Sequence, residues 1–414
     1  MNLTTPSRHE DVFSTFRLTT FRSLRHRNYR LFFFGQIISL VGTWIQMVAQ
    51  GWLVYSLTRS SFWLGLIGFL GSLPILGLSL IGGSMADRVS KRALLVATQT
   101  LAMSLALCLA FLVWTKHITV AWVGVLAFGM GLANAFDMPA RQAFVVEMVG
   151  KEDLTNAIAL NSAIFNGARL IGPAIGGMLI ASVGIAWCFF LNGISFIPVI
   201  IGLLAMHVSR PNPDNNRRNS VWQSIREGIC YIYQTRPIRA LIILVGTVTI
   251  FGWSYSILLP VFAKEILHGN AVTLGNLMAA NGVGALLSAL MLASIGDRIP
   301  TRRSLFIGLS TFVVSVTLFS LSKILWLSLL LLVGVGFGLI SFFITANSTL
   351  QRRVPDQLRG RVMGVYALVF GGFFPIGSLQ IGAMAHVLGA PQATIIGAAI
   401  CAGAAFIVSR TVSR

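Results

Sequence analysis

The sequence predicts an all-α membrane protein whose twelve transmembrane helices form two pseudo-symmetric six-helix bundles. Three observations lead to this prediction. First, the 414 residues are 55% hydrophobic and only 10% charged, whereas a soluble domain carries about 25% charged residues. Second, twelve apolar runs are each long enough to cross a bilayer, which takes about 20 residues. Third, a charged stretch near position 87 recurs 210 positions later, close to half the chain length.

The chain begins with a basic tail, residues 1–30, which holds six arginines and allows at most a short amphipathic surface helix near 21–29. The tail lacks the apolar core of about 7–15 residues that a cleavable signal needs, so none is expected. The N-terminal six-helix bundle covers 31–207 and the C-terminal bundle, with a short tail, covers 239–414. We place the spans at about 31–57, 62–86, 93–115, 119–145, 155–183, 185–206, 239–264, 271–293, 304–322, 324–350, 362–386 and 392–409.

A linker over 208–238 separates the two bundles. Residues 209–219 are polar, with two prolines and several asparagines and arginines. Residues 220–234 then place Val221, Ile225, Ile229 and Ile232 on one helical face. We therefore expect an amphipathic helix that lies on the membrane surface.

The distribution of basic residues predicts the orientation. With the N-terminus inside, 26 of the 31 lysines and arginines fall in inner segments and only four in outer loops. This bias places both termini in the cytoplasm and the chain in the plasma membrane as a multi-pass protein. The net charge of +19 is thus assigned to topology and to contact with anionic lipid, and no nucleic-acid partner is expected.

No cofactor, metal site or enzymatic activity is expected. The four cysteines are scattered without a paired spacing, which disfavours a disulfide framework or a zinc site. The chain has no phosphate-binding loop of the Gly-x-x-x-x-Gly-Lys type, so it is not expected to pump by hydrolysing ATP. It also has no nucleophile–base constellation that would indicate a membrane enzyme.

Two similar charged loops join the second to the third span and the eighth to the ninth. Each carries an aspartate followed by an arginine. A carboxylate there can cap a helix of the other bundle, and the nearby cations can pair with acids, which predicts a gate. The alternative is that these charges fix only the topology. The expected gating residues are Gly83, Asp87, Arg88, Lys91, Arg92, Asp297 and Arg298.

The first loop, Gly83-x-x-x-Asp87-Arg88-x-x-Lys91-Arg92, resembles the signature loop between helices 2 and 3 of the major facilitator superfamily. It departs from the usual pattern at Ser90, where the superfamily has glycine, and in the second copy at Ala293. The resemblance implies the major facilitator fold, transport by alternating access, and a loop network that latches the outward-open state.

Three further stretches, 38–44, 156–161 and 356–363, resemble the subgroup of the superfamily that contains the enterobactin exporter. One departure bears on the coupling mechanism. Ala127 stands where many proton-coupled drug exporters of the superfamily have an arginine, about four residues before Gly131.

Asp137 is the acid placed most clearly inside a predicted span. An intramembrane carboxylate is costly and is a functional hypothesis by default. It suggests either a protonation site that couples transport to a proton gradient or a relay partner of the signature loop, as the resemblance implies. The structural alternatives are a pair with Arg141 at i+4, with Lys91, or with Arg169, which lies deep in the fifth span. Arg169 is otherwise a fixed cation suited to an anionic or phenolic substrate.

The fifth span contains Gly172-Pro173-x-x-Gly176-Gly177. Small residues on one face allow close helix packing and proline bends the helix, so we assign these four residues to packing. The run also resembles the helix-5 signature of superfamily antiporters, which are mainly exporters.

Polar and aromatic residues within the spans are the remaining candidates. Some are expected to line a substrate cavity, and others only to bridge helices by hydrogen bonds. In the superfamily, helices 1, 4, 7 and 10 usually line the cavity. The expected cavity residues are Gln36, Trp44, Asn134, Asn161, Arg169, Trp253, Tyr255 and Asn347.

Together these features predict a monomeric secondary active transporter of the inner membrane. Its expected task is proton-driven antiport that exports a small organic molecule, either a drug-like compound or a siderophore. The alternative within transport is uptake of a small metabolite. A membrane enzyme is among the least favoured functions because the chain lacks a nucleophile–base constellation. A receptor is equally disfavoured, because it would not need two similar charged loops at matching positions.

Overall fold

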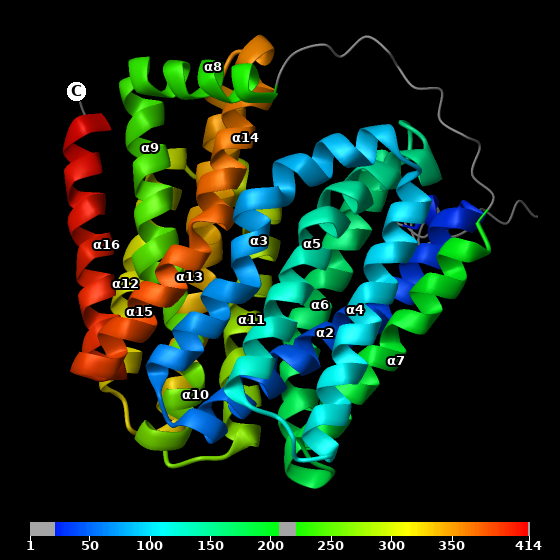
Figure 1. Cartoon of the computed structure of the whole chain (residues 1–414). Coiled ribbons are helices and arrows are strands. Elements are labelled where there is room, and N and C mark those ends of the chain that lie inside the picture. Colours follow the sequence, from blue (N-terminus) through cyan, green and yellow to red (C-terminus); the bar gives the residue numbers. More distant parts are fainter. Residues whose placement is uncertain (1–20, 207–220, 413–414) are drawn as a thin grey trace, which may run out of the picture.

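The computed structural model describes residues 21–206 and 221–412, and within these ranges the chain is all helical (Figure 1). The side chains at 79–84, 86–88, 221–225, 297 and 410–412 lie outside the description. Twelve helical segments are long and apolar enough to cross a membrane. The predicted all-α membrane class is confirmed.

The first bundle begins with a short 3₁₀ turn, Arg22–Arg25, which leads directly into the first span. Pro74, Pro139 and Pro173 lie inside helices, where the remaining backbone bonds keep each span continuous. The six spans are α2 (Arg27–Thr58), α3 (Ser61–Arg88), α4 (Lys91–Trp114), α5 (Val120–Val149), α6 (Leu154–Ser182) and α7 (Ile185–Leu204).

The second bundle contains two broken spans. The seventh span alternates between α, π and 3₁₀ geometry, and the eleventh is interrupted at Phe373. Its elements are α9 (Arg236–Thr247), η2 (Val248–Gly252), η3 (Trp253–Leu258), α10 (Leu259–Val261) and η4 (Phe262–Ile266), then α11 (Ala271–Ile295), η5 (Gly296–Arg298), α12 (Thr301–Leu321), α13 (Leu325–Arg353), α14 (Asp356–Gly372), α15 (Phe374–Leu388) and α16 (Ala390–Val412).

Several predicted boundaries differ from the observed ones by three to six residues, and three helix starts illustrate this. The first span begins at Arg27, and the short helix allowed near 21–29 is reduced to the 3₁₀ turn Arg22–Arg25 before it. The seventh begins at Arg236, inside the expected linker, and the eleventh at Asp356. In each case polar residues form the first turn of the helix, where hydropathy does not reveal them because they lie outside the apolar run.

The amphipathic helix expected before the second bundle is α8 (Val221–Gln234). It lies across one end of the molecule, at the top of Figure 1, where it packs on α14. Glu227 of α8 forms an ion pair with Arg361 of α14. Since successive spans alternate in direction, α2 begins and α16 ends on this same side. We call it the α8 end, and the opposite side the far end.

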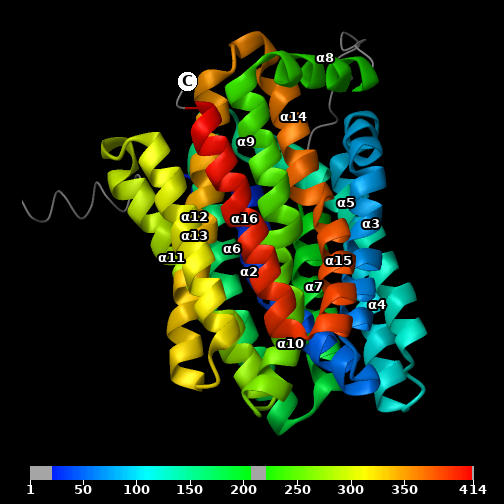
Figure 2. The same cartoon turned by 90° about the vertical axis from the view of Figure 1, so that its left-hand side faces the viewer.

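The two bundles meet through a pseudo-symmetric pair of contacts. The second span of the first bundle, α3, packs on α15 in the fifth span of the second bundle; conversely, α6 packs on α11 (Figures 1 and 2). Each contact centres on facing glycines. A Cβ on Gly65 would lie 2.8 Å from the Cα of Gly382, and one on Gly177 would lie 3.2 Å from the Cα of Gly275. Side chains at these positions would force the backbones apart.

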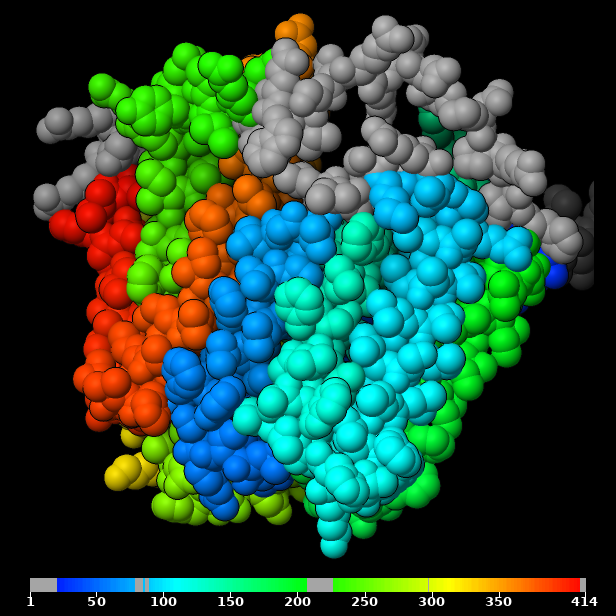
Figure 3. Space-filling model, in the orientation of Figure 1, coloured from blue at the N-terminus to red at the C-terminus, as the bar shows by residue number. Residues whose placement is uncertain are grey.

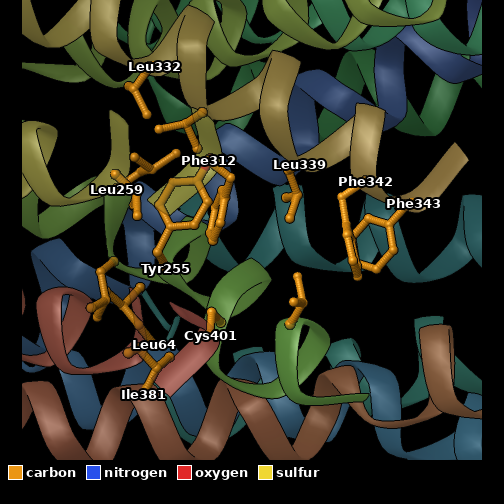
Figure 4. Packing of buried hydrophobic residues seen from close by; sticks show 14 of the residues in the cluster. Leu64, Tyr255, Leu259, Phe312, Leu332, Leu339, Phe342, Phe343, Ile381 and Cys401 are labelled. Carbon is orange, nitrogen blue, oxygen red and sulfur yellow. The ribbon is translucent and has the colours of Figure 1, made fainter. Parts of the chain in front are cut away.

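The largest buried cluster extends through both bundles. Leu64 of α3 and Ile381 of α15 belong to it, as do Tyr255 and Phe312 within the second bundle (Figure 4). On the outside, helices α3, α4 and α5 form a continuous side-chain surface in the view of Figure 3. Many apolar side chains are exposed in α4 and α5, such as Phe111 at 62%. These are the side chains that a bilayer would cover.

Candidate substrate site

The loop expected to act as a gate is tied to its own bundle on one side. Lys91 Nζ lies 2.6 Å from Glu147 Oε1 of α5. Arg92 donates hydrogen bonds to the carbonyl oxygens of Leu204 at 2.7 Å and Met206 at 2.9 Å, at the end of α7. The beginning of α4 is therefore fixed against α5 and α7.

Asp297 and the first-loop residues Gly83, Asp87 and Arg88 lie at positions whose side-chain surroundings are outside the description. Arg298 is exposed at the end of η5. The gating role of the two loops therefore stays a prediction.

Asp137 is buried in α5, with an exposed fraction of 3%. Its Oδ1 accepts hydrogen bonds from Thr98 Oγ1 at 3.0 Å and Gln99 Nε2 at 2.7 Å, both on α4. Its Oδ2 forms an ion pair with Arg141, one turn along the same helix. Arg141 in turn donates to Gln36 Oε1 of α2 at 2.5 Å. The carboxylate is thus fully partnered, as a buried charge requires.

Two of the pairings considered for Asp137 were wrong. Lys91 is engaged by Glu147 instead, and Arg169 points to the second bundle. Gln36 was expected to contact substrate, but it is 3% exposed and bonded to Arg141. Gln36 and Asp137 face the interior of the first bundle, where the rotation of each helix about its axis brings both of them to Arg141.

Arg169 lies at the interface between the bundles. Its Nη2 donates a hydrogen bond to Asn281 Oδ1 of α11 at 2.8 Å, and Asn281 Nδ2 donates to the Tyr255 hydroxyl at 2.6 Å. The guanidinium carbon lies 6.0 Å from the ring centroid of Trp44 on α2. Trp44 meets Phe165 of α6 edge to face, with centroids 5.9 Å apart. Four spans from both bundles therefore contribute to one polar and aromatic cluster.

The cation in this cluster has no anionic partner. Arg169 forms no ion pair with any residue that the structure describes; its neighbours are an amide and aromatic rings. A charge inside a membrane span is expensive and marks a functional site by default. Phe165, beside it, keeps 46% of its surface exposed. The cluster therefore offers a fixed positive charge next to accessible aromatic surface.

The other expected cavity residues are dispersed. Asn161 accepts a hydrogen bond from the Tyr29 hydroxyl at 3.1 Å, which joins α2 to α6. Trp253 packs among Phe343, Phe370 and Phe374 of the second bundle. Asn347 accepts from Gln351 at 2.6 Å. Asn134 is partly buried in α5. The structure does not bring these four residues together with Arg169.

The small residues of the fifth span allow α6 to approach its neighbours closely. A Cβ on Gly172 would lie 2.5 Å from Cβ of Trp44, and one on Gly176 would lie 3.2 Å from Cα of Ile45, both on α2. Gly177 faces α11, and Pro173 supplies a carbonyl oxygen against Gly275. The close contact at Gly172 also fixes the position of Trp44 beside Arg169.

Sequence reasoning missed two members of the cluster. Asn281 is a polar residue in an apolar span, but many other residues of the chain share this feature, so it did not single out Asn281. Phe165 precedes Arg169 by four positions and so lies on the same helical face, but nothing distinguished it from other aromatic residues. Within 21–206 and 221–412, no group of three or more His, Cys, Asp or Glu residues is arranged to hold a metal ion.

Comparison with known proteins gives one family. The family model described as "Transmembrane secretion effector" matches residues 18–413. Among curated proteins, the chain is 26% identical to the staphyloferrin A transporter of Staphylococcus aureus over 369 residues, covering 87% of this chain and 90% of that protein. It is 28% identical to the multidrug efflux pump Tap of Mycolicibacterium fortuitum, covering 87% and 89%.

The enterobactin exporter EntS of Escherichia coli is 25% identical, covering 82% of this chain and 81% of that protein. Among solved structures, a bacterial homologue of the iron transporter ferroportin in an inward-facing state has a TM-score of 0.71 at 16% identity, covering 94% and 99%. The nucleoside transporter NupG has a TM-score of 0.73 at 12% identity, with the same coverage. At these identities the structural likeness shows the fold, and the predicted fold class is confirmed.

Proposed function

Because the chain belongs to the transmembrane secretion effector family, we propose that Arg169 anchors the molecule that this transporter exports. The chain is an integral multi-pass membrane protein, a transporter rather than an enzyme. It exports small organic molecules, as do relatives named for siderophore export and multidrug efflux. Substrate class, coupling ion and orientation are proposals.

The observation that supports an anionic or phenolic substrate is a cation between the bundles, Arg169, that forms no ion pair within the described part of the chain. Arg169 is held by Asn281 of the opposite bundle and lies against Trp44. A substrate carboxylate or phenolate would replace the neutral amide of Asn281 as the acceptor of the Arg169 hydrogen bond. The new bond would join two opposite charges and would therefore be stronger. The substrate's apolar or aromatic part would lie against Trp44 and Phe165. Since the site draws on both bundles, its occupancy would change when the bundles rock.

We propose that protons drive export and that the Asp137 group serves as a relay. Asp137 and Arg141 form a buried ion pair whose cation also reaches Gln36 of α2. Protonation of this carboxylate would release Arg141 and loosen the link between α5 and α2. Because both carboxylate oxygens already have partners within the first bundle, the proposed role is a relay between helices rather than direct contact with substrate.

We further propose that the α8 end faces the cytoplasm of a plasma membrane. The bias of 26 basic residues toward this side supports the orientation. In this proposed orientation both termini, α8 and the two charged loops would lie in the cytoplasm. We propose a monomer as the working unit, because one chain supplies both bundles and the cluster between them.

Transport into inside-out vesicles tests the proposal. Vesicles containing the protein should accumulate anionic aromatic compounds from a panel when the lumen is acidified. They should accumulate neutral compounds of the same shape much less, and dissipation of the proton gradient should abolish accumulation. Equal transport of charged and neutral compounds would overturn the anionic substrate class. Accumulation that survives loss of the gradient would overturn proton coupling.

A further inference from the structure

Two small cavities lie side by side at the far end, where the bundles touch. The first has a volume of about 170 Å³ and is lined by Trp52, Tyr55, Ser56, Arg59 and Lys264. The second, of about 270 Å³, shares Tyr55 and Arg59 with it and also reaches Glu265 and His386. Both cavities draw residues from each bundle. They therefore lie at the far-end edge of the interface between the bundles.

The first cavity combines cations with aromatic rings. Lys264 Nζ lies 5.7 Å from the ring centroid of Trp52, and Arg59 lines the same space. The far-end loops hold only four basic residues in all, so two of the four converge here. A cation over an aromatic face and a second cation beside it form a site for an aromatic anion: the ring packs on Trp52 and the negative group lies between the two cations.

Glu265, which lines the second cavity, is the anion that now pairs with Arg59, the cation shared by both cavities. Its Oε1 lies 3.3 Å from Arg59 Nη1, and the two side chains are 49% and 60% exposed. Ion pairs this exposed contribute little stability. An incoming carboxylate or phenolate can therefore take the place of Glu265 at Arg59 without a large loss. Because this pair joins the first bundle to the second, its exchange would also loosen the far end.

Helix α2 contributes one tryptophan to the central cluster and another to the first cavity. Trp52 lies eight positions after Trp44 in α2, which is about 12 Å along the axis and slightly more than two turns. Trp44 contacts Arg169 and Trp52 contacts Lys264. Each tryptophan thus presents an aromatic face next to a cation.

We propose that the first cavity, which we call the far-end cavity, is a second binding site, specific for small aromatic anions. The bound anion competes with Glu265 for Arg59. In transport this cavity is an exit site, occupied after the central cluster and before release. The role as an exit site rests on the proposed export function. Binding to the cavity does not, so the two can be tested separately.

The experiment measures binding of benzoate to the purified full chain in detergent by ligand-observed NMR, with neutral benzamide as the matched probe. Wild-type protein should bind benzoate more tightly than benzamide. Lys264→Gln and Arg59→Gln should each weaken benzoate binding by about two- to fivefold, the range expected for one exposed charge. Lys116→Gln, which removes another far-end cation outside the cavity, should leave it unchanged.

Glu265→Gln gives the sharpest result, because it removes the competing anion and should tighten benzoate binding by about two- to fivefold. Equal affinity in the parent and in both cation variants, weaker binding to Glu265→Gln, or no benzoate binding at all would each overturn the proposal. The melting temperature and the gel-filtration elution volume are measured for every variant. Only variants that match the parent in both are compared.

An Arg169→Gln background separates the two sites. The Arg169→Gln protein should still bind benzoate at the far end. If this variant no longer binds benzoate, the signal came from the central cluster and the second site is overturned. If instead Arg169→Gln transports anionic compounds normally while benzoate binding still depends on Lys264, the proposed central anchor fails and the far-end site stands.

Discussion

Arg169 and Asn281 lie 112 positions apart, one in each bundle, yet they form a 2.8 Å hydrogen bond. The bond connects α6 to α11, the two helices that also meet through Gly177 and Gly275. A change in the relative tilt of the bundles must alter this contact. The charge proposed to hold substrate is therefore positioned by a contact between the two bundles.

Replacing Arg169 tests the anchor. Arg169→Gln should insert and fold, since glutamine can still donate to Asn281, but should transport anionic aromatic compounds about tenfold more slowly because a charge-assisted hydrogen bond is lost. Neutral compounds should be affected little. The readout is the initial transport rate in vesicles at equal protein levels. Full transport of anions by a stable Arg169→Gln protein would contradict the substrate role.

The buried pair Asp137–Arg141 should behave as one unit. Asp137→Asn strands the Arg141 cation, and Arg141→Gln strands the carboxylate, so each should cost about 3–5 kcal/mol of stability. The double variant should recover much of this loss. A double-mutant cycle on melting temperature measures the coupling, with Glu147→Gln as a control for a less buried pair. Simple additivity would contradict the pairing.

Asp137 and Arg169 belong to different networks, so their effects on stability should add. Combining Asp137→Asn with Arg169→Gln should lower the melting temperature by the sum of the two single effects. A double variant more stable than that sum would indicate a direct contact, which the structure does not contain.

The signature loop can be tested without reference to substrate chemistry. Asp87→Asn should largely abolish transport while expression and melting temperature stay near those of the parent, because the substitution keeps the size of the side chain and removes the charge that the gate requires. Vesicle transport and thermal unfolding are measured on the same preparation. Normal transport by Asp87→Asn would leave topology as the only role of the loop.

Asp153 should fix the beginning of the chain in a pH-dependent manner. It is 1% exposed and lies 2.7 Å from His26 Nε2, with Arg22 and Arg25 at 2.8 and 2.9 Å. The hydrogen bond from His26 and the two guanidinium groups lower the pKa of Asp153 below its ordinary value of 3.8. Its contribution is therefore present above about pH 4 and is lost as the pH falls through the lowered pKa.

Limited proteolysis near Arg25 measures this attachment. Protection should be constant from pH 7 to pH 5 and should disappear in strongly acidic buffer. Asp153→Asn should be cleaved readily at every pH, and Glu152→Gln, its exposed neighbour, should match the parent. Equal cleavage of Asp153→Asn and the parent at pH 7 would show that these contacts do not hold the segment.

The orientation is tested by thiol labelling in intact cells. A cysteine introduced at Lys116 should react with an impermeant reagent, because the far end is expected to face outward. A cysteine at Asn215, in the linker between the bundles, should react only after the cells are opened. The native cysteines Cys108 and Cys230 are exposed, so labelling is compared with the unmodified parent. The reverse pattern would overturn the proposed topology.

The sequence alone determined the membrane class, the number of spans and the family. The class and the spans follow from local composition: an apolar run of sufficient length must form a helix in a bilayer, because lipid offers no partner for an exposed backbone group. The family follows from the resemblance of the loop Gly83–Arg92 to a superfamily signature. The same scarcity of charges in the spans singled out Asp137 and Arg169 as costly residues that need partners. The sequence also predicted the amphipathic helix α8, from the periodic spacing of its apolar residues.

Only the tertiary structure decided which partners these residues have. The depth of a residue in the membrane can be estimated from its distance along the helix. By this estimate, Arg169 was within reach of Asp137. The rotation of each helix about its axis cannot be read in this way. It depends on close packing between distant segments, such as Gly172 against Trp44 and Gly177 against Gly275. The packing of α6 turns Arg169 toward Asn281 of the other bundle, whereas α5, held against α3 at Gly131, turns Asp137 toward α4. The relay inside one bundle is thereby separated from the charged site between the two.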